Sequence, residues 1–285
     1  MTEGEFEKHR SQLRAVAYRM LGSSADADDA LQDAWLRVSR SDTAAVENMG
    51  AWLTTVVARV CLDQLRSRRQ RREVHVPDPI ISPEDGVGPE ESALMADGVG
   101  LALLVVLESL SPAERLAFVL HDTFGVPFDD IATVLDRTPE ATRKLASRAR
   151  RRVRGQAPDP DPDLSRQREV VGAFFAAARD GDFEALVSVL HPDVVLRSDG
   201  GTARPQLTLT IHGAEQVAAQ ARLTSQLAPF VRPVLVNGVP GVVVAPRGQV
   251  QVVMAFTVTD AKIVAIDVLG DPERLADLDL SAVLE

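Results

Sequence analysis

The residues best suited to bind nucleic acid lie in a basic segment, residues 137–154, with eight basic residues against a single acid. Upstream, Ser111-Pro112-Ala113-Glu114 is a capping box that predicts a helix start with proline in its first turn. A short helix is expected at 128–135, and the turn Asp136–Pro139 then predicts a last helix with Thr138 as its N-cap. This order predicts a helix–turn–helix, whose second helix enters the major groove of DNA.

The last helix of this motif carries the residues expected to contact DNA. Polar residues near its N-terminus lie where base edges are usually contacted, and the later arginines suit phosphates. A solvated basic helix at a domain edge is the alternative, but charge concentrated behind a capped turn favours DNA binding. The candidates are Thr142, Arg143, Lys144, Ser147, Arg148 and Arg151, with Arg150, Arg152 and Arg154 as further phosphate contacts.

A second basic segment, residues 59–72, holds six arginines against one acid, Asp63. Trp52 lies on the same predicted helix, which an apolar stripe marks from Leu53 to Val60. Cations beside an aromatic ring are what single-stranded or melted nucleic acid needs, for phosphates and for base stacking. The alternative is a solvated helix end that favours cations through its dipole.

Composition restricts the function classes. Apolar residues make up 45% and charged residues 25%, which excludes a largely disordered chain and a collagen-like fibre. The net charge is −10, and the part after Gly155 carries ten basic and seventeen acidic residues, a net of −7. The longest apolar run, 99–107, is too short to cross a bilayer, and no secretory signal precedes it. The single cysteine and the absence of a Cys/His cluster predict no disulfide, metal or cofactor, and a cytoplasmic protein.

Two proline-rich stretches, 73–100 and 155–164, are expected to resist helix and sheet and to act as linkers. They divide the chain into blocks 1–72, 101–154 and 165–285. The first two blocks are helical by their apolar period. The third begins with amphipathic helices and continues with alternating strand-like segments, which predicts an α+β domain.

Three motifs together resemble a known family: Asp26-Ala-Asp-Asp-Ala-Leu-Gln-Asp-Ala-Trp35, Trp52-Leu-Thr-Thr-Val-Val-Ala-Arg-Val-Cys-Leu-Asp-Gln-Leu-Arg66, and Leu110-Ser-Pro-Ala-Glu-Arg115. In order and spacing they resemble an extracytoplasmic-function (ECF) sigma factor of the sigma-70 family. The resemblance implies two all-α domains, a region 2-like bundle at 1–72 and a region 4-like helix–turn–helix at 101–154. It also implies binding to promoter DNA and to core RNA polymerase, through the largest-subunit clamp and the flap.

By the same resemblance, three groups of residues acquire roles. Two residues of these groups have a structural alternative to the role that the resemblance implies. Trp35 completes an apolar stripe, so packing of its ring in the core is the alternative, and Asp63 is equally placed to pair with a neighbouring arginine. The polymerase-docking residues would be Asp28, Asp29, Gln32, Asp33 and Trp35. The residues that melt and recognise the minus-10 element would be Asn48 in the loop 42–49 with Trp52, Arg59, Asp63 and Arg66. The minus-35 element would be recognised by the candidates on the last helix, from Thr142 to Arg151.

Block 165–285 resembles a SnoaL-like domain of the cone-shaped NTF2 fold, an extension carried by the SigJ-like group of these sigma factors. In that group the extension regulates the sigma region in cis, which implies that no separate anti-sigma protein is needed. The group's linker motif corresponds here to Val76-Pro77-Asp78-Pro79. Its glycine loop is one glycine short, and its late motif reads Asp271-Pro272-Glu273-Arg274-Leu275. The regulatory residues would be Asp199, Gly200, Gly201, Asp271, Pro272 and Leu275.

Some NTF2-fold relatives are enzymes, so acid–base candidates need consideration. His191, Asp199 and His212 adjoin predicted turns, and Asp267, inside the alternating segment 263–268, is the residue expected to face into the cone. Catalysis is disfavoured, and the chain is expected not to be an enzyme. The alternative is a DNA-binding regulator fused to a SnoaL-type ligand-binding or catalytic domain. A plain helix–turn–helix repressor ranks third, because it has no use for a clamp-docking domain.

Overall fold

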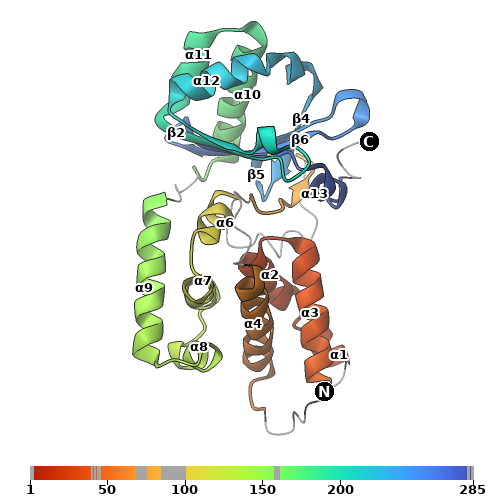
Figure 1. Cartoon of the computed structure of the whole chain (residues 1–285), viewed down its shortest axis with the longest axis vertical. Helices are drawn as coiled ribbons and strands as arrows, with labels where there is room; N and C mark the ends of the chain where they lie inside the picture. Colours follow the sequence, from red (N-terminus) through yellow and green to blue (C-terminus); the bar gives the residue numbers. More distant parts are fainter. Residues whose placement is uncertain are drawn as a thin grey trace. The chain divides into compact units, whose positions relative to one another are not determined.

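The computed structural model describes residues 3–39, 41, 43, 46–68, 76–84, 101–156, 161–280 and 283, and it forms two compact units (Figure 1). The first unit contains the two helical domains. The second contains the α+β domain together with residues 76–84, and helix α6 (Leu101–Glu108) runs from one unit into the other. No helix in the described residues is both long and apolar enough to span a membrane.

The first helical domain is a bundle in which α2, α3 and α4 all contact one another. Its apolar stripes are buried as the sequence predicts, with Val16, Ala30 and Val57 fully inaccessible. Ser23 accepts a hydrogen bond from the amide of Asp26 and so caps α3, while the left-handed Gly22 ends α2. The helices are α1 (Glu3–Glu7), α2 (Arg10–Leu21), α3 (Ser24–Val38) and α4 (Met49–Arg68).

The second helical domain is the predicted helix–turn–helix. The capping box is present, because the Ser111 hydroxyl and the Glu114 carboxylate each accept a hydrogen bond from the other's backbone amide. Asp136, at φ 53°, ends the short helix, and the Thr138 hydroxyl caps the last one. The elements are α7 (Pro112–Phe118), a π-helical turn (Val119–Thr123), α8 (Phe128–Leu135) and α9 (Pro139–Gln156).

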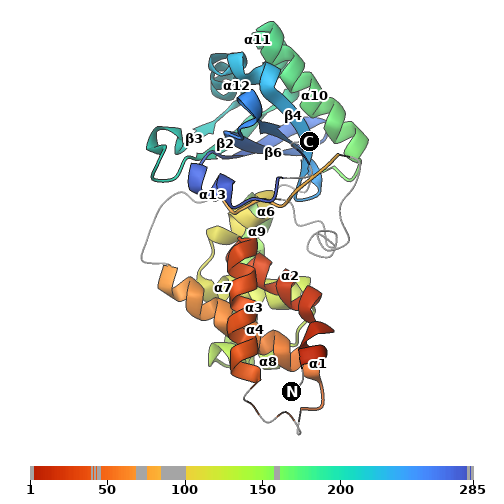
Figure 2. The ribbon, with the colours of Figure 1, turned by 90° about the vertical axis from the view of Figure 1, so that its right-hand side faces the viewer.

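The second unit is an α+β domain, which confirms the expected class (Figure 2). Helices α10, α11 and α12 contact one face of a curved sheet whose strand order is β1-β4-β5-β6-β7-β2-β3. Within the described residues, β2 and β7 pair in parallel and all other neighbours pair antiparallel. The helices are α10 (Leu164–Asp180), α11 (Phe183–Val189), α12 (Ala214–Leu223) and α13 (Pro272–Ala276). The strands are β1 (Ile81–Ser82), β2 (Leu190–Asp199), β3 (Leu209–His212), β4 (Val231–Val236), β5 (Val239–Val244), β6 (Val252–Thr259) and β7 (Lys262–Leu269).

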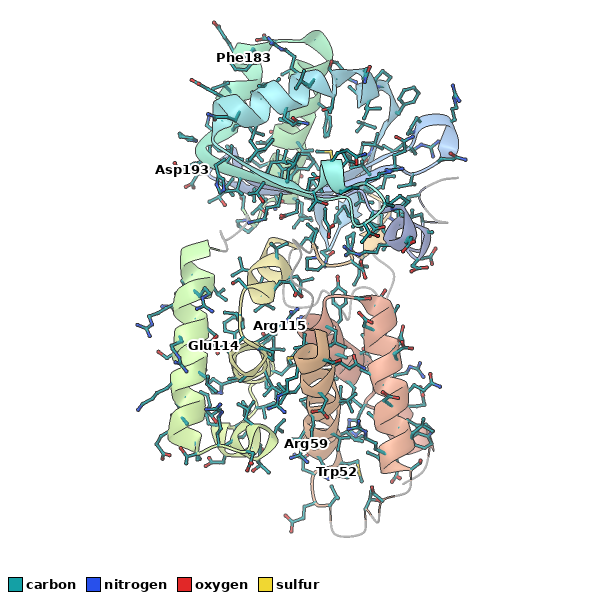
Figure 3. The ribbon with its side chains drawn as sticks, in the orientation of Figure 1. Trp52, Arg59, Glu114, Arg115, Phe183 and Asp193 are labelled. Carbon is teal, nitrogen blue, oxygen red and sulfur yellow. The ribbon has the colours of Figure 1, made fainter. Side chains whose placement is uncertain are left out.

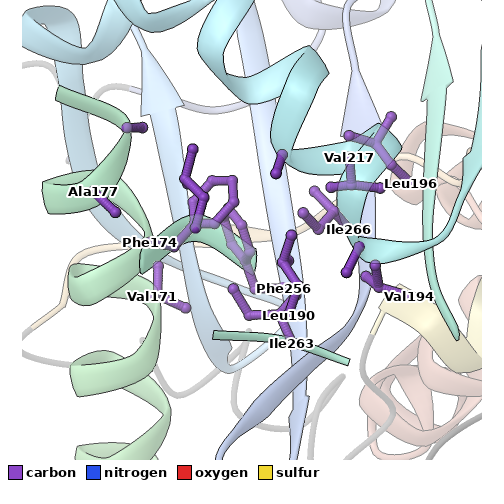
Figure 4. Close-up of a cluster of buried hydrophobic side chains, with 14 of the residues drawn as sticks. Val171, Phe174, Ala177, Leu190, Val194, Leu196, Val217, Phe256, Ile263 and Ile266 are labelled. Carbon is purple, nitrogen blue, oxygen red and sulfur yellow. The ribbon is translucent and has the colours of Figure 1, made fainter. Parts of the chain in front are cut away.

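The core of this domain lies between the helices and the sheet (Figure 4). Phe174 on α10 and Phe256 on β6 approach with ring centroids 5.7 Å apart, and both rings are buried. Two-residue turns at positive φ join β4 to β5, at Asn237-Gly238, and β6 to β7, at Asp260-Ala261. Asn237-Gly238 joins β4 to β5 with both residues at positive φ, the arrangement of a type I′ hairpin turn.

The proline-rich stretch before α6 contributes to this sheet. Ile81 pairs with Val236, and the amide of Ile80 donates to the side-chain oxygen of Asn237 at 3.0 Å. The expectation that this stretch resists sheet formation is therefore wrong for β1. The reason is tertiary, because the edge of β4 supplies the partners that a two-residue strand cannot supply for itself.

Candidate functional site

Helix α9 presents one exposed basic face. Its exposed candidates recur at a spacing that places them on one side of the helix. Thr142 is different: it is fully buried, and its hydroxyl donates to the carbonyl of Thr138 at 3.0 Å. Thr142 is therefore removed from the set of DNA-contacting residues, because its side chain belongs to the packing of the helical hairpin. The remaining set is Arg143, Lys144, Ser147, Arg148 and Arg151.

Several cations of α9 are held by acids of the same domain, among them Glu114, which is labelled in Figure 3. Arg148 and Arg152 lie 3.6 Å and 3.4 Å from the carboxylate oxygens of Glu114, and Arg150 lies 2.5 Å from Asp122. Burial acts to raise the pKa of Glu114, but hydrogen bonds from Ser111 and the two arginines outweigh it and hold that pKa below its usual value.

In contrast, Lys144 and Arg151 form no ion pair with any described residue. Arg143 lies 4.0 Å from Glu140 and stacks over the ring of Phe128 at 5.5 Å. The exposed face therefore carries cations whose charge is available for a phosphate or a base edge, beside others that also hold α9 to α7.

The minus-10 candidates on α4 lie next to α8 (Figure 3). Trp52 and Arg59 line a recess of about 540 Å³, which we call the α4–α8 recess, together with Thr133 and other residues of both helices. The guanidinium of Arg59 donates to the carbonyl of Thr133 at 3.1 Å. The structure thus brings two candidates together and places them against the second helical domain.

The other minus-10 candidates have structural partners as well. Asn48 accepts a hydrogen bond from the amide of Ala51 at 3.1 Å, so its side chain caps α4. Asp63 lies 3.8 Å from Arg66 and 3.9 Å from Arg37, all exposed. Such exposed pairs contribute little to stability, so these contacts leave the side chains able to change partner.

The polymerase-docking candidates on α3 separate into two groups. Asp28 forms two hydrogen bonds with Arg14, at 2.8 Å and 2.9 Å, and Trp35 packs on Phe6 with ring centroids 5.4 Å apart. These two side chains therefore hold α3 to its neighbours.

The second group forms a continuous exposed face of α3. Asp29, Gln32 and Asp33 are exposed, and beside them Leu36 is 50% exposed. The sequence analysis missed Leu36, although its position off the apolar stripe of α3 is a readable signal. Leu36 therefore lies on the same exposed face as the three docking candidates.

A buried arginine joins the two helical domains. Arg115, on α7, is 2% exposed, and its guanidinium donates to the carbonyl of Arg19 on α2 and to Glu108, at 3.3 Å and 2.5 Å. The guanidinium of Arg19 lies 4.8 Å from the centre of the Phe124 ring. The sequence analysis used Arg115 only as part of a motif, because its burial depends on a segment nearly a hundred residues away.

In the second unit the three regulatory motifs meet, at a site that we call the clasp: Val76, Asp78, Asp199 and Arg274. Asp199 is 4% exposed and accepts hydrogen bonds from the Val76 amide at 3.0 Å and from Arg274 at 2.8 Å. Arg274 also donates to Asp78 at 2.6 Å and to the carbonyl of Val76. One guanidinium therefore ties the proline-rich stretch to two distant segments of the α+β domain.

The remaining regulatory candidates shape the clasp. Gly201 adopts φ +60°, and a Cβ there would overlap the carboxylate of Asp271. Asp271 caps α13 by accepting from the Glu273 amide at 3.0 Å, Pro272 opens the helix, and Leu275 is buried beneath it. Gly200 donates its amide to the Thr208 hydroxyl. Arg274 was quoted within the late motif but not predicted as a site residue, since only the fold shows what it contacts.

The acid–base candidates do not form a site. Asp267 lies on β7 opposite Arg197 of β2, and its carboxylate accepts from that guanidinium at 2.7 Å. Strand alternation places both on the sheet face opposite Val268 and Leu196, so the expectation that Asp267 faces into the cone is wrong. Burial raises its pKa, and Arg197 opposes that shift. His212 is exposed, and His191 accepts a hydrogen bond from the amide of Asp193.

Comparison with known proteins decides the family. Two family models match this chain: sigma-70 region 2 over residues 6–71, and sigma-70 region 4 over residues 100–153. The chain is 39% identical to the ECF RNA polymerase sigma factor SigJ of Mycobacterium tuberculosis, across 96% of this chain and 93% of that protein. The chain belongs to the ECF RNA polymerase sigma factors.

Further relatives agree with this assignment. The probable ECF sigma factor SigI of Mycobacterium tuberculosis is 34% identical across 95% of this chain and 93% of its own length. The crystal structure of SigJ superposes with a TM-score of 0.78 at 35% identity, covering 98% of this chain and all of that one. The match includes the α+β domain, so the predicted three-domain class is confirmed.

As an ECF sigma factor, the chain binds core RNA polymerase and promoter DNA and directs transcription initiation. Sigma factors are not enzymes, which confirms the corresponding prediction. The hypothesis of a DNA-binding regulator of another class is thereby excluded.

Proposed function

We propose a division of labour for this sigma factor, which acts in the cytoplasm where polymerase and promoter meet. Helix α9 recognises the minus-35 element through Arg143, Lys144, Ser147, Arg148 and Arg151. Helix α4 and the loop before it recognise the melted minus-10 element. The proposal rests on exposure and charge: the α9 face has cations that no described acid neutralises, and the α4–α8 recess combines an aromatic ring with a guanidinium.

We assign polymerase docking to the exposed face of α3, residues Asp29, Gln32, Asp33 and Leu36, and its partner to the clamp of the largest subunit. Changing Asp29 and Asp33 to Lys together is expected to abolish co-purification with core polymerase while helical content is retained, because both side chains lie off the apolar stripe. Asp129→Lys, an exposed acid on α8, is the matched control. Unchanged co-purification of the double variant would remove α3 from the interface.

The function proposed for the α+β domain is regulation in cis. The observation that carries it is the clasp, in which residues 76–82, part of the connection between the two helical domains, are bonded into the α+β domain. Any event that alters the clasp therefore alters the chain that links the two promoter-binding domains. A domain in the same polypeptide is always present at high effective concentration, so we propose that no separate anti-sigma protein is needed.

The test is transcription in vitro with core polymerase and a promoter library. The full-length protein is compared with a protein that ends at Arg154, at matched concentrations and salt. We expect promoter-specific transcription to change several-fold, because the shortened protein lacks the domain that holds residues 76–82. Equal transcription by the two proteins would refute regulation in cis.

A further inference from the structure

The α+β domain contains a cavity of about 510 Å³ between its helices and its sheet. Its walls include Phe174 and Phe175 of α10, Leu196 of β2 and Met254 of β6. The two phenyl rings stand edge to face with centroids 5.4 Å apart. A volume of this size and a mainly apolar wall are typical of a small-molecule site. The cavity shares no lining residue with the clasp or with the α4–α8 recess.

The charges on the cavity wall are strongly asymmetric. Its lining includes one charged side chain, Arg204, and no aspartate, glutamate or lysine. Arg204 is half-buried, and its Nη1 donates to the carbonyl oxygens of Gln251 and Gly270 at 3.0 Å and 3.3 Å. Among the described residues it forms no salt bridge. The guanidinium is therefore held in place by neutral carbonyls, and its positive charge is not balanced by a neighbouring carboxylate.

We propose that this cavity binds a small organic acid, with its carboxylate on Arg204 and its apolar body against Phe174, Phe175 and Met254. A guanidinium fixed by other bonds binds a carboxylate with little loss of side-chain freedom, and charge-assisted hydrogen bonds are the strong ones. The apolar body gains from leaving water for the aromatic wall.

The lining favours binding over turnover. No histidine, cysteine or tyrosine lines the cavity, and Asp267 and its partner Arg197 lie on the other face of the sheet. A general acid–base reaction needs a group that can exchange a proton beside the substrate, and this wall offers none. The acid is therefore a ligand that leaves chemically unchanged.

The position of Arg204 connects the cavity to the clasp. Gly270, whose carbonyl Arg204 contacts, donates its own amide to the carbonyl of Asp199 at 2.7 Å and immediately precedes Asp271. A carboxylate bound to Arg204 places a negative charge next to that contact, two residues before α13 begins. This coupling rests on the proposed regulation in cis, whereas the binding site itself does not.

The test uses the full-length protein and matched pairs of probes, naphthoate with naphthylmethanol and decanoate with decanol, measured by calorimetric titration. We expect the acids to bind, and Arg204→Gln to weaken them about tenfold while leaving the alcohols unchanged. Arg179→Gln, at an exposed position on α10, is the matched control. Ala221→Trp fills the cavity and is expected to remove binding of acids and alcohols alike.

Several outcomes would overturn the site: no binding of either acid, equal binding of acids and alcohols, or wild-type affinity of Arg204→Gln for the acids. Because the titration measures no transcription, these failures are distinct from failure of the regulatory proposal. Hydrogen exchange at the Val76 and Ile80 amides, with and without naphthoate, tests the coupling. Faster exchange with the acid supports it, and unchanged exchange in a protein that binds the acid refutes it.

Discussion

Distant segments of the chain meet at the clasp and at the α4–α8 recess, and the contacts at these two places differ in burial and in number. At the clasp, Arg274 and Asp199 are largely buried, and one guanidinium contacts two carboxylates and a carbonyl. At the recess, the corresponding hydrogen bond, from Arg59 to the Thr133 carbonyl, is a single exposed contact. Water competes for the second contact far more effectively than for the first.

The difference indicates which contact belongs to the fold and which can open. Removing one member of a buried charged cluster is costly, so residues 76–82 are an integral part of the α+β domain. An exposed bond of a long side chain is nearly balanced by hydration, so Arg59 can exchange Thr133 for a phosphate. We therefore expect promoter DNA to be able to replace the contact that Arg59 makes with Thr133.

The largest effect is expected from breaking the clasp. Arg274→Ala removes the cation that faces Asp199 and Asp78, and should lower the free energy of unfolding of the α+β domain by about 3–5 kcal/mol. Denaturant unfolding measures this loss, and hydrogen exchange at the Val76 amide should accelerate with it. Arg179→Ala is the control, expected to stay within about 0.5 kcal/mol of the unmodified protein. A loss no larger than that of the control would show that the clasp is not integral to the fold.

A smaller loss is expected from distorting the clasp without removing a charge. Gly201→Ala places a Cβ against the Asp271 carboxylate at a positive φ, and should cost about 1–3 kcal/mol in the same unfolding measurement. Gly172→Ala is its matched control, since that helical glycine has open space around it and alanine there should be neutral or stabilising. Equal stability of the two variants would contradict the geometry given for the glycine loop.

In the first unit, Glu114→Gln tests the contacts that hold α9 to α7. The variant should lose about 1 kcal/mol at neutral pH, because the capping box and the pairs with Arg148 and Arg152 weaken. The pKa of Glu114 is lowered in the folded protein, so its contribution is present above the unfolded value of about 4.5 and is lost as pH falls through the folded pKa. The difference between wild type and variant should therefore shrink on acidification. Glu169→Gln, an exposed position on α10, should show no such convergence.

The smallest effect on stability is expected at the α4–α8 recess. Arg59→Ala should change the free energy of unfolding by less than about 0.5 kcal/mol, because the lost hydrogen bond is exposed. Promoter opening, followed by permanganate reactivity of thymines, should nevertheless fall several-fold if Arg59 contacts the melted strand. Arg10→Ala, at an exposed position on α2, should alter neither measurement. A large loss of stability in Arg59→Ala would place this contact in the same class as the clasp.

The helix–turn–helix could be predicted closely, because its signals are local. The Ser111–Glu114 box, the turn at Asp136 and the cap at Thr138 each act within one turn of helix, so neighbouring residues are enough to specify them. The burial of Thr142 was also open to prediction. It shares a helical stripe with Leu145 and Ala149, and that apolar period outweighs its polar type.

The β-strands of the α+β domain were only partly predictable. The Asn237-Gly238 hairpin is a strong local signal, yet the sequence analysis did not identify it. At 263–268 alternation identifies two faces of a strand but not which of them faces the core, so Asp267 was placed on the wrong face. Its neighbour across the sheet, Arg197, is what permits a carboxylate to be buried there.

The sequence by itself determined the class of this protein, because the motifs at 26–35, 52–66 and 110–115 carry in their order and spacing the resemblance to an ECF sigma factor, which the comparisons confirm. Only the tertiary structure decided which candidate side chains are exposed to a partner and which are held by contacts within the protein. The clasp joins residue 76 to residue 274, the Arg115 contact joins α7 to α2, and Arg204 meets Gly270 across the domain. Such contacts depend on the packing of distant segments, and local periodicity and capping carry no information about which distant groups will meet.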